Sequence, residues 1–190
     1  MIVALALLDD VPIMAIAFDK AEVSSRPVRW QMDRVLLVSS MLGLLAVVQS
    51  FALLYIGDTV WHLSKPELQT MMFLQLVAGG HLMLFLTRNR RGFWNEPYPS
   101  AILLLAILGT QLLAVVVTGF GVLVEPISWT LIGWVWVYNL FWMVAQDLIK
   151  VCLYKALERR STNQTHFQAK LWKPLAPWAG LHRRKHAPRL

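Results

Sequence analysis

The chain alternates between long apolar runs and short polar segments over most of its length. Five apolar runs occupy residues 1–18, 35–57, 70–87, 100–121 and 127–149. Each run approaches the roughly 20 residues that an α-helix needs to cross about 30 Å of hydrocarbon. The runs are continuously apolar rather than alternating in polarity, which disfavours the strands of a membrane barrel. The pattern therefore predicts an all-α fold, a polytopic membrane helix bundle of about five transmembrane helices.

The polar stretch after the last run divides the chain into two predicted parts. Residues 1–157 form a transmembrane domain, and residues 158–190 form a basic cytoplasmic tail that ends in the sequence HRRKHAPRL. A basic segment near a membrane is attracted to anionic lipid by about 1 kcal/mol per cation. Apolar residues such as Trp172 and Trp178 could rest in the interface. We expect the tail to contact anionic lipid; a free tail and a partner-binding tail are the alternatives.

Positively charged residues gather in alternate connections between the runs. They lie in the first connection (Lys20, Arg26, Arg29, Arg34), in the third (Arg88, Arg90, Arg91) and at the start of the tail (Lys150, Lys155, Arg159, Arg160). The second connection has Lys65 alone, and the fourth has Glu125 and no cation. Because cytoplasmic connections collect Lys and Arg, the pattern predicts an outside amino terminus and a cytoplasmic carboxyl terminus.

Composition and charge support the membrane class. The chain is 57% hydrophobic and 15% charged, with a mean hydropathy of +0.52. The net charge is +7, but the cations lie between apolar runs rather than on one compact face, so we expect no nucleic-acid partner. Cys152 is the single cysteine, which excludes an intrachain disulfide. Residues 1–17 lack a basic n-region and contain Asp9, Asp10 and Pro12, which argues against a signal peptide.

Two adjacent carboxylates in the first run are the candidate site. An ionised Asp9 or Asp10 within the bilayer costs at least about 2.5–3.5 kcal/mol, so such groups are functional by default. Pro12 has no amide hydrogen and its ring clashes with the Leu8 carbonyl, which predicts a first helix broken near Pro12. Freed carbonyls and acids at one depth are typical of ion-binding cavities in transporters. One of the two acids could hold a proton near neutral pH and release it when its surroundings change. The alternative is a pair of acids at a helix end, facing water or a cation of an absent partner.

Other polar residues in the apolar runs carry weaker signals. We expect His81 to be a hydrogen-bonded packing residue, and Gln49, Gln75, Gln111 and Asn139 to bond across helices. Asp147 and Lys150 are three residues apart, which predicts a surface pair of small energetic weight. The sequence holds no phosphate loop, metal-ligand cluster or nucleophile motif.

Two segments carry a resemblance to a known family. The sequence ALLDDVPIMAIAFD (residues 6–19), followed by RPVRW (residues 26–30), resembles the plasma-membrane proton-pump (type III) branch of the P-type ATPases. The resemblance begins at the sixth transmembrane helix of that family, and the later runs match helices seven to ten in number, length and orientation. It implies that Asp10 is the proton acceptor. The preceding family position is commonly Asn and is Asp9 here.

The resemblance also implies what this chain would not do alone. The family's phosphorylated aspartate, its nucleotide-binding and actuator domains and its first five helices have no counterpart here, so ATP and Mg²⁺ would belong to missing domains and no cofactor is expected in this chain. Apart from the first, the loops have about a dozen residues or fewer and no room for the groups of phosphoryl transfer, so we expect no ATP hydrolysis from this chain alone. The implied partners are H⁺, the missing domains or remaining helices, and anionic lipid, in the plasma membrane. The alternative is a non-transporting membrane scaffold or regulatory subunit.

Overall fold

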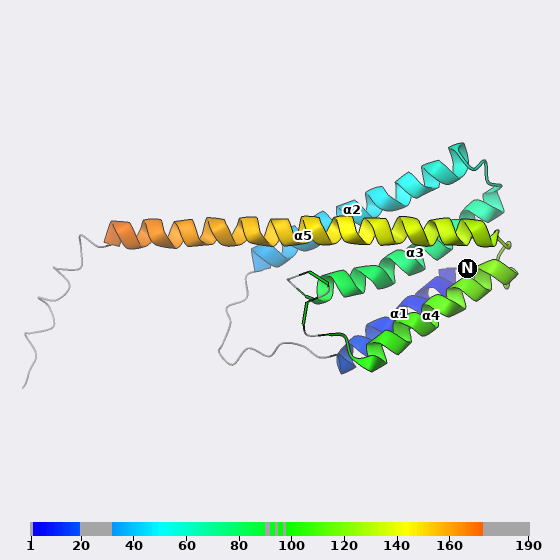
Figure 1. The fold of residues 1–190 in the computed structure, drawn as a ribbon, viewed down its shortest axis with the longest axis horizontal. Coiled ribbons are helices and arrows are strands. Elements are labelled where there is room, and N and C mark those ends of the chain that lie inside the picture. The colour runs from blue at the N-terminus through cyan, green and yellow to red at the C-terminus, as the bar shows by residue number, and fades with distance from the viewer. Residues whose placement is uncertain (1, 20–31, 90–91, 94, 97, 173–190) are drawn as a thin grey trace, which may run out of the picture. The chain divides into compact units, whose positions relative to one another are not determined.

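The structure is a computed structural model that describes residues 2–19, 32–89, 92–93, 95–96 and 98–172, with side chains up to residue 157. Its elements are α1 (Ile2–Ala15), the 3₁₀-helix η1 (Ile16–Phe18), α2 (Met32–Thr59), α3 (Lys65–Arg88), α4 (Ala101–Phe120) and α5 (Trp129–Trp172) (Figure 1). The described residues contain no strand. The predicted all-α class and the five helices are confirmed.

The chain divides into two compact units, Met1–Val151 and Cys152–Leu190. In the second unit α5 continues as far as Trp172, so the segment predicted as a tail begins in helical conformation. The predicted lipid contacts of the tail involve residues 171–181 and lie outside the side chains that the structure describes. The basic residues at positions 20, 26, 29, 90 and 91 also lie outside the described residues.

Three helices, α2, α3 and α4, are long and apolar enough to cross a membrane by length and composition. The most apolar stretch of α2 is only 17% buried inside the protein. Leu105, Leu112 and Phe120 on α4 are exposed by 67–70%. An apolar surface of this kind suits lipid or further helices better than water. Helix α1 has 14 residues and spans about 21 Å, and the first part of α5 is rich in tryptophan, so membrane crossing by these two helices stays a prediction.

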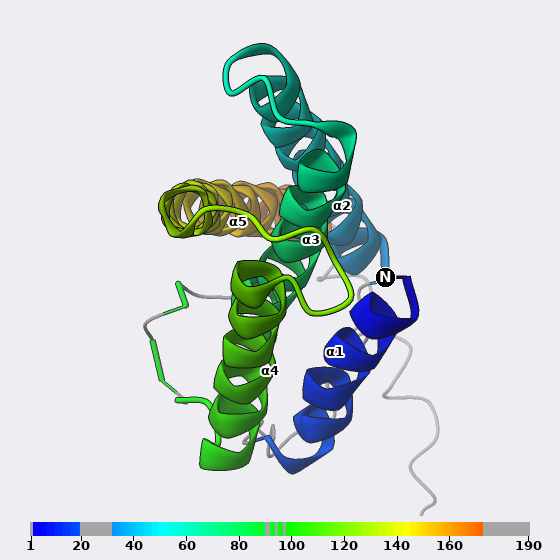
Figure 2. The same ribbon diagram turned by 90° about the vertical axis from the view of Figure 1, so that its right-hand side faces the viewer.

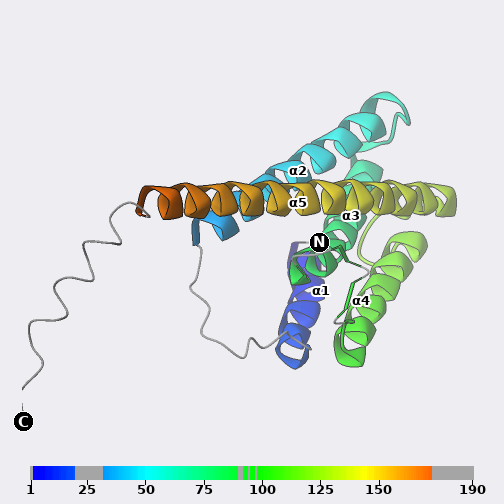
Figure 3. The same ribbon diagram turned by 60° about the vertical axis from the view of Figure 1, so that its left-hand side comes forward.

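Within the first unit successive helices run in opposite directions, and α3 lies between its neighbours (Figures 1 and 3). Helices α1 and α4 lie side by side, and both contact α3 (Figure 2). The core is formed by side chains without exposed surface, among them Leu53, Met71, Leu74, Val77, Ala114 and Val135. Because α3 supplies more of them than any other helix, it is the central helix of this unit.

The expectation of a first helix broken at Pro12 is wrong. Helix α1 continues through Pro12 and ends at Ala15, where η1 begins. A proline inside a helix removes one hydrogen bond, the one that its amide would donate to the carbonyl four residues earlier. Here that carbonyl belongs to Leu8, and His81 of α3 lies within hydrogen-bond distance of it, so the helix continues through Pro12.

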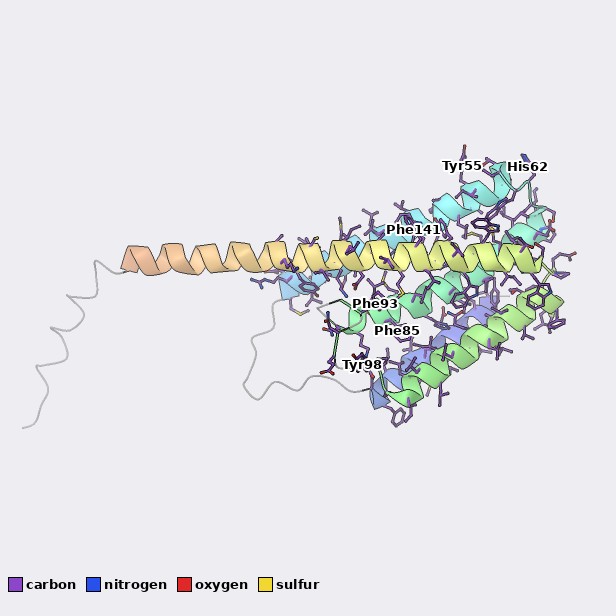
Figure 4. All side chains as sticks on the ribbon, in the orientation of Figure 1. Tyr55, His62, Phe85, Phe93, Tyr98 and Phe141 are labelled. Carbon is purple, nitrogen blue, oxygen red and sulfur yellow. The ribbon has the colours of Figure 1, made fainter. Side chains whose placement is uncertain are left out.

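Capping residues satisfy backbone groups at the ends of α3 and α4. At the start of α3, the Ser64 amide donates to Glu67 Oε2 over 2.9 Å, half of a capping box. At the start of α4, the Ser100 hydroxyl accepts the Leu103 amide over 3.2 Å. Helix α4 ends at Gly121 with φ of 72°, a left-handed conformation that favours glycine. Figure 4 shows Tyr55 and His62 at the α2–α3 end of the bundle, and Phe93 and Tyr98 beyond the other end of α3.

Candidate functional site

Helix α1 presents its two carboxylates to different surroundings. The buried residues of α1 are Leu8, Pro12 and Ala15, which define its inner face. Adjacent residues of a helix point about 100° apart. Asp9 therefore lies at the edge of the inner face, and Asp10 lies on the exposed face. Of the two predicted site residues, only Asp9 faces the described helices.

The Asp9 carboxylate has one oxygen inside the protein. Oδ1 is buried and accepts no hydrogen bond from the described residues. His81 Nε2 of α3 lies 3.4 Å from it. The Asp9 side chain as a whole is 35% exposed, so the remainder of the carboxylate is accessible. The Asp9 carboxylate is therefore buried on the side of Oδ1 and accessible on its other side.

His81 replaces the hydrogen bond that Pro12 removes. In a regular helix the amide of residue 12 would donate to the carbonyl of Leu8, but proline has no amide hydrogen. His81 Nε2 lies 3.2 Å from this carbonyl oxygen and can donate to it. A buried carbonyl without a partner is destabilising by about 1–3 kcal/mol. The expected freed backbone oxygen at Pro12 therefore exists, and a side chain of α3 satisfies it without unwinding α1.

Gln111 of α4 determines which ring nitrogen of His81 carries the hydrogen. Gln111 Nε2 donates to the Val77 carbonyl over 3.3 Å, and it lies 2.9 Å from His81 Nδ1. Because a backbone carbonyl only accepts, the group that faces it must be the NH₂ of the amide. The same NH₂ then donates to Nδ1, which leaves the hydrogen of a neutral imidazole on Nε2. Asp9, His81 and Gln111, here called the Asp9 cluster, thus join α1, α3 and α4.

A second polar group joins α2, α3 and α5, as predicted for Gln49, Gln75 and Asn139, and it includes Gln146, which was not predicted. Gln146 donates to Gln49 over 2.9 Å, Gln49 donates to Asn139 over 3.0 Å, and Asn139 donates to Gln75 over 2.7 Å. Tyr138 Oη donates to the Gln49 carbonyl over 2.7 Å. The four amide side chains are at most 5% exposed. Since each pairs across a helix boundary, the network fixes the register of these helices.

The prediction that Asp147 and Lys150 form a surface pair is wrong. Both side chains are 1% exposed, with Nζ 2.7 Å from Asp147 Oδ1. Lys150 Nζ also donates to the Leu86 carbonyl over 2.8 Å, and the Phe93 amide donates to Asp147 Oδ2 over 3.4 Å. The last carbonyls of a helix have no partner within it. Lys150 therefore caps the end of α3, which explains why the pair is buried.

A third charged group was not predicted. Arg88 Nε forms an ion pair with Asp19 Oδ2, and both side chains are at most 11% exposed. Asp19 Oδ1 also accepts the Ser100 amide over 2.8 Å. One carboxylate thereby joins the chain after η1 to the end of α3 and the start of α4. The position of Asp19 directly after the apolar run is the only sequence signal that could have indicated it.

The polar groups of the site come from three different residue types. In the part of the chain that the structure describes, no three His, Cys, Asp or Glu side chains come together as metal ligands. The Asp9 cluster offers a carboxylate, an imidazole and an amide joined by hydrogens. These groups can hold, donate and accept protons.

Fold and site define a helical membrane protein with paired carboxylates on an apolar helix, a class that includes ion-translocating proteins. Comparison with known proteins narrows this class. The chain is 43% identical over 158 residues to "Putative cation-transporting ATPase MJ1226" of Methanocaldococcus jannaschii. It is 28% identical to "Probable proton ATPase 1A" of Leishmania donovani and 29% identical to "Plasma membrane ATPase 1" of Saccharomyces cerevisiae. No protein-family model matches the sequence.

The extent of these matches is as informative as their identity. The match to the Methanocaldococcus protein covers 83% of this chain and 20% of that relative. The match to the Leishmania protein covers 83% of this chain and 19% of the relative. The match to the Saccharomyces protein covers 84% of this chain and 18% of the relative. The chain therefore spans about a fifth of the length of the curated relatives it matches. It is homologous to a segment of P-type cation-transporting ATPases, and the other domains of such proteins lie outside this sequence.

Proposed function

We propose that the chain is the carboxyl-terminal membrane portion, helices six to ten, of a proton-exporting P-type ATPase. In this proposal α1 is the sixth helix and supplies the proton-binding carboxylates, with Asp10 as the acceptor and Asp9 beside it. The observation that carries the proposal is the placement of two adjacent carboxylates on one apolar helix, in a chain homologous to segments of cation-transporting ATPases.

The surroundings of the two acids support a division of roles. Asp10 lies on the face of α1 that the described helices leave exposed, where the preceding helices of an ATPase could pack. Asp9 faces α3 and reaches His81. Carboxylates with two different surroundings can hold and release a proton as neighbouring helices move, which is what alternating access requires.

The proposed location is the plasma membrane, with the amino terminus outside and the carboxyl terminus in the cytoplasm. Arg34 at the start of α2, Arg88 at the end of α3 and Lys150 in α5 belong to the end of the bundle predicted to be cytoplasmic. The acidic residues Asp58, in the last turn of α2, and Glu125, between α4 and α5, belong to the opposite end. The charge distribution follows the positive-inside rule.

In this proposal ATP binding and hydrolysis belong to the domains outside the sequence. The described connections between α2 and α3 and between α4 and α5 are too short to supply the phosphate- and metal-positioning groups of phosphoryl transfer. The chain alone would not hydrolyse ATP, and it would act by coupling proton movement to domains that do.

The test uses an ATPase assembled from this chain and the missing helices and soluble domains, reconstituted in vesicles. We expect ATP-driven acidification of inside-out vesicles, and its loss in Asp10→Asn. Asp58→Asn, which removes an exposed carboxylate in the last turn of α2, is the matched control and should transport normally. Full transport by Asp10→Asn would refute the assigned role.

The alternative, a non-transporting scaffold or regulatory subunit, is distinguished by the same assembly. A scaffold would associate with an intact ATPase and leave its transport unchanged by substitution of either carboxylate. A transport portion would be required for activity and sensitive to Asp10.

A further inference from the structure

Both ring nitrogens of His81 have neighbours in the Asp9 cluster. One N–H of His81 lies between two acceptors, the Leu8 carbonyl at 3.2 Å and Asp9 Oδ1 at 3.4 Å. The opposite ring nitrogen is occupied by the Gln111 amide at 2.9 Å. The imidazole therefore has a defined tautomer and a single available hydrogen.

We propose that the Asp9 cluster is a proton-binding site in which Asp9 takes the proton, while His81 positions Asp9 and Gln111 excludes metal ions. This inference deepens the proposed function and rests on it, since it names the ligand class and the partners of one of the two α1 carboxylates. The proton adds to the Asp9 carboxylate and gives a neutral carboxyl group. The His81 hydrogen stays on Nε2 and is donated to Asp9 when that group is ionised, and to Leu8 when it is protonated.

The exclusion of metal ions follows from the hydrogen positions. A histidine binds a metal through a ring nitrogen lone pair. At His81 the Nδ1 lone pair accepts the Gln111 amide, and Nε2 carries hydrogen. The oxygens that remain are the two of the Asp9 carboxylate, the Leu8 carbonyl and Gln111 Oε1, fewer than the six to eight that Ca²⁺ takes. A proton needs one oxygen only.

The charges around the cluster are few. Helix α4, which supplies Gln111, contains no ionisable side chain. On α3 the nearest ionisable residue after His81 is Arg88, about two turns away, and it is paired with Asp19. On α1 the adjacent charge is Asp10. Among the described residues, the ion-pair partner of Asp9 is His81, and neither a lysine nor an arginine is paired with it.

The first test measures the tautomer of His81. The full chain is labelled with ¹⁵N in its histidine rings, placed in lipid nanodiscs and observed by NMR. We expect hydrogen on Nε2 and none on Nδ1. Gln111→Leu removes the donor to Nδ1 and should lower the ratio of Nε2–H to Nδ1–H about fivefold, the equivalent of one ordinary hydrogen bond. His62, exposed in the α2–α3 turn, is the internal control, and its signals should be the same in every variant.

The second test observes Asp9 itself. The infrared difference between acidic and basic samples should contain a protonated-carboxyl band that Asp9→Asn abolishes and Asp10→Asn retains. His81→Leu should shift this band, and His81→Gln, whose amide N–H can take the place of Nε2–H, should restore its position. Na⁺, K⁺, Ca²⁺ or Zn²⁺ at millimolar concentration should change neither the band nor the His81 signals.

Three results would overturn the inference: hydrogen on Nδ1 in the unmodified chain, a carboxyl band indifferent to His81→Leu, or displacement of the proton by a metal ion. None of these readouts uses ATP. If Asp10→Asn abolishes transport and these tests fail, the proposed function stands and the inference about Asp9 is wrong.

Discussion

At the scale of single residues, the structure separates polar groups that look alike in the sequence. Asp9 and Asp10 are neighbours, yet one faces His81 and the other faces outward. The sequence predicts an intramembrane acid pair but not this difference, because the direction of a side chain depends on which helices pack against α1. It likewise misses the burial of Asp147 and Lys150, since the unpaired Leu86 carbonyl that attracts Lys150 belongs to another helix.

The buried pair gives a prediction for stability. Lys150→Met would leave the Asp147 carboxylate buried without its cation, so we expect a loss of about 3–5 kcal/mol in the free energy of unfolding. The double variant Asp147→Leu/Lys150→Met removes both charges and should recover most of the loss. Denaturant unfolding in detergent micelles measures both values.

Lys155→Met is the matched control for this prediction. Lys155 is an exposed lysine on the same helix, and its replacement should change the free energy of unfolding by less than about 0.5 kcal/mol. An equal effect of Lys150→Met and Lys155→Met would mean that the ion pair does not stabilise the protein.

At the scale of elements, the sequence predicts the helices. It does not predict that His81 replaces the hydrogen bond missing at Pro12. Apolar runs place all five helices, because a run of this length has no other stable conformation in lipid. A proline predicts a local break, but the α3 residue that compensates for it, His81, lies 73 positions after Leu8. A sequence read element by element does not reveal such a partner.

The compensation at Pro12 is testable as a coupling between two substitutions. His81→Leu in the natural chain leaves the Leu8 carbonyl without a donor and should cost about 1–3 kcal/mol. In a Pro12→Ala background the backbone amide at position 12 regains its hydrogen and can donate to the Leu8 carbonyl, so the same change should cost less. The four proteins of the double-mutant cycle are compared by their free energies of unfolding.

A coupling near zero would contradict the replacement of the proline hydrogen bond by His81. The cycle also removes the general gain in helix propensity expected from Pro12→Ala, because that gain occurs in both backgrounds. Only the interaction between the two positions remains in the result.

At the scale of the whole molecule, charge, apolar surface and similarity lead to one interpretation. The described helices expose many large apolar residues, and the matched segments make up only about a fifth of the homologous ATPases. The length of the apolar runs predicts the membrane class, and the sidedness inferred from the charges between the runs stays a prediction. Length and charge could not supply the arrangement around Asp10, because in the proposed pump that environment includes helices outside this sequence.

The lone cysteine allows a direct test of sidedness. Cys152 is exposed and follows the last predicted span, so the positive-inside rule places it on the cytoplasmic side. We expect a membrane-impermeant maleimide to label it in inside-out vesicles and not in right-side-out vesicles. Glu125→Cys in a Cys152→Ser background should show the opposite pattern. Labelling of Cys152 from outside would reverse the proposed orientation.

The most direct measurement is the identity of the ion moved by the assembled ATPase. Inside-out vesicles are supplied with ATP in a medium whose metal cations, other than the required Mg²⁺, are replaced by an impermeant organic cation, and luminal pH is recorded. If α1 carries protons, the lumen acidifies at an undiminished rate, and Asp10→Asn removes the acidification. ATP-driven uptake of a metal tracer without acidification would contradict proton transport by this chain.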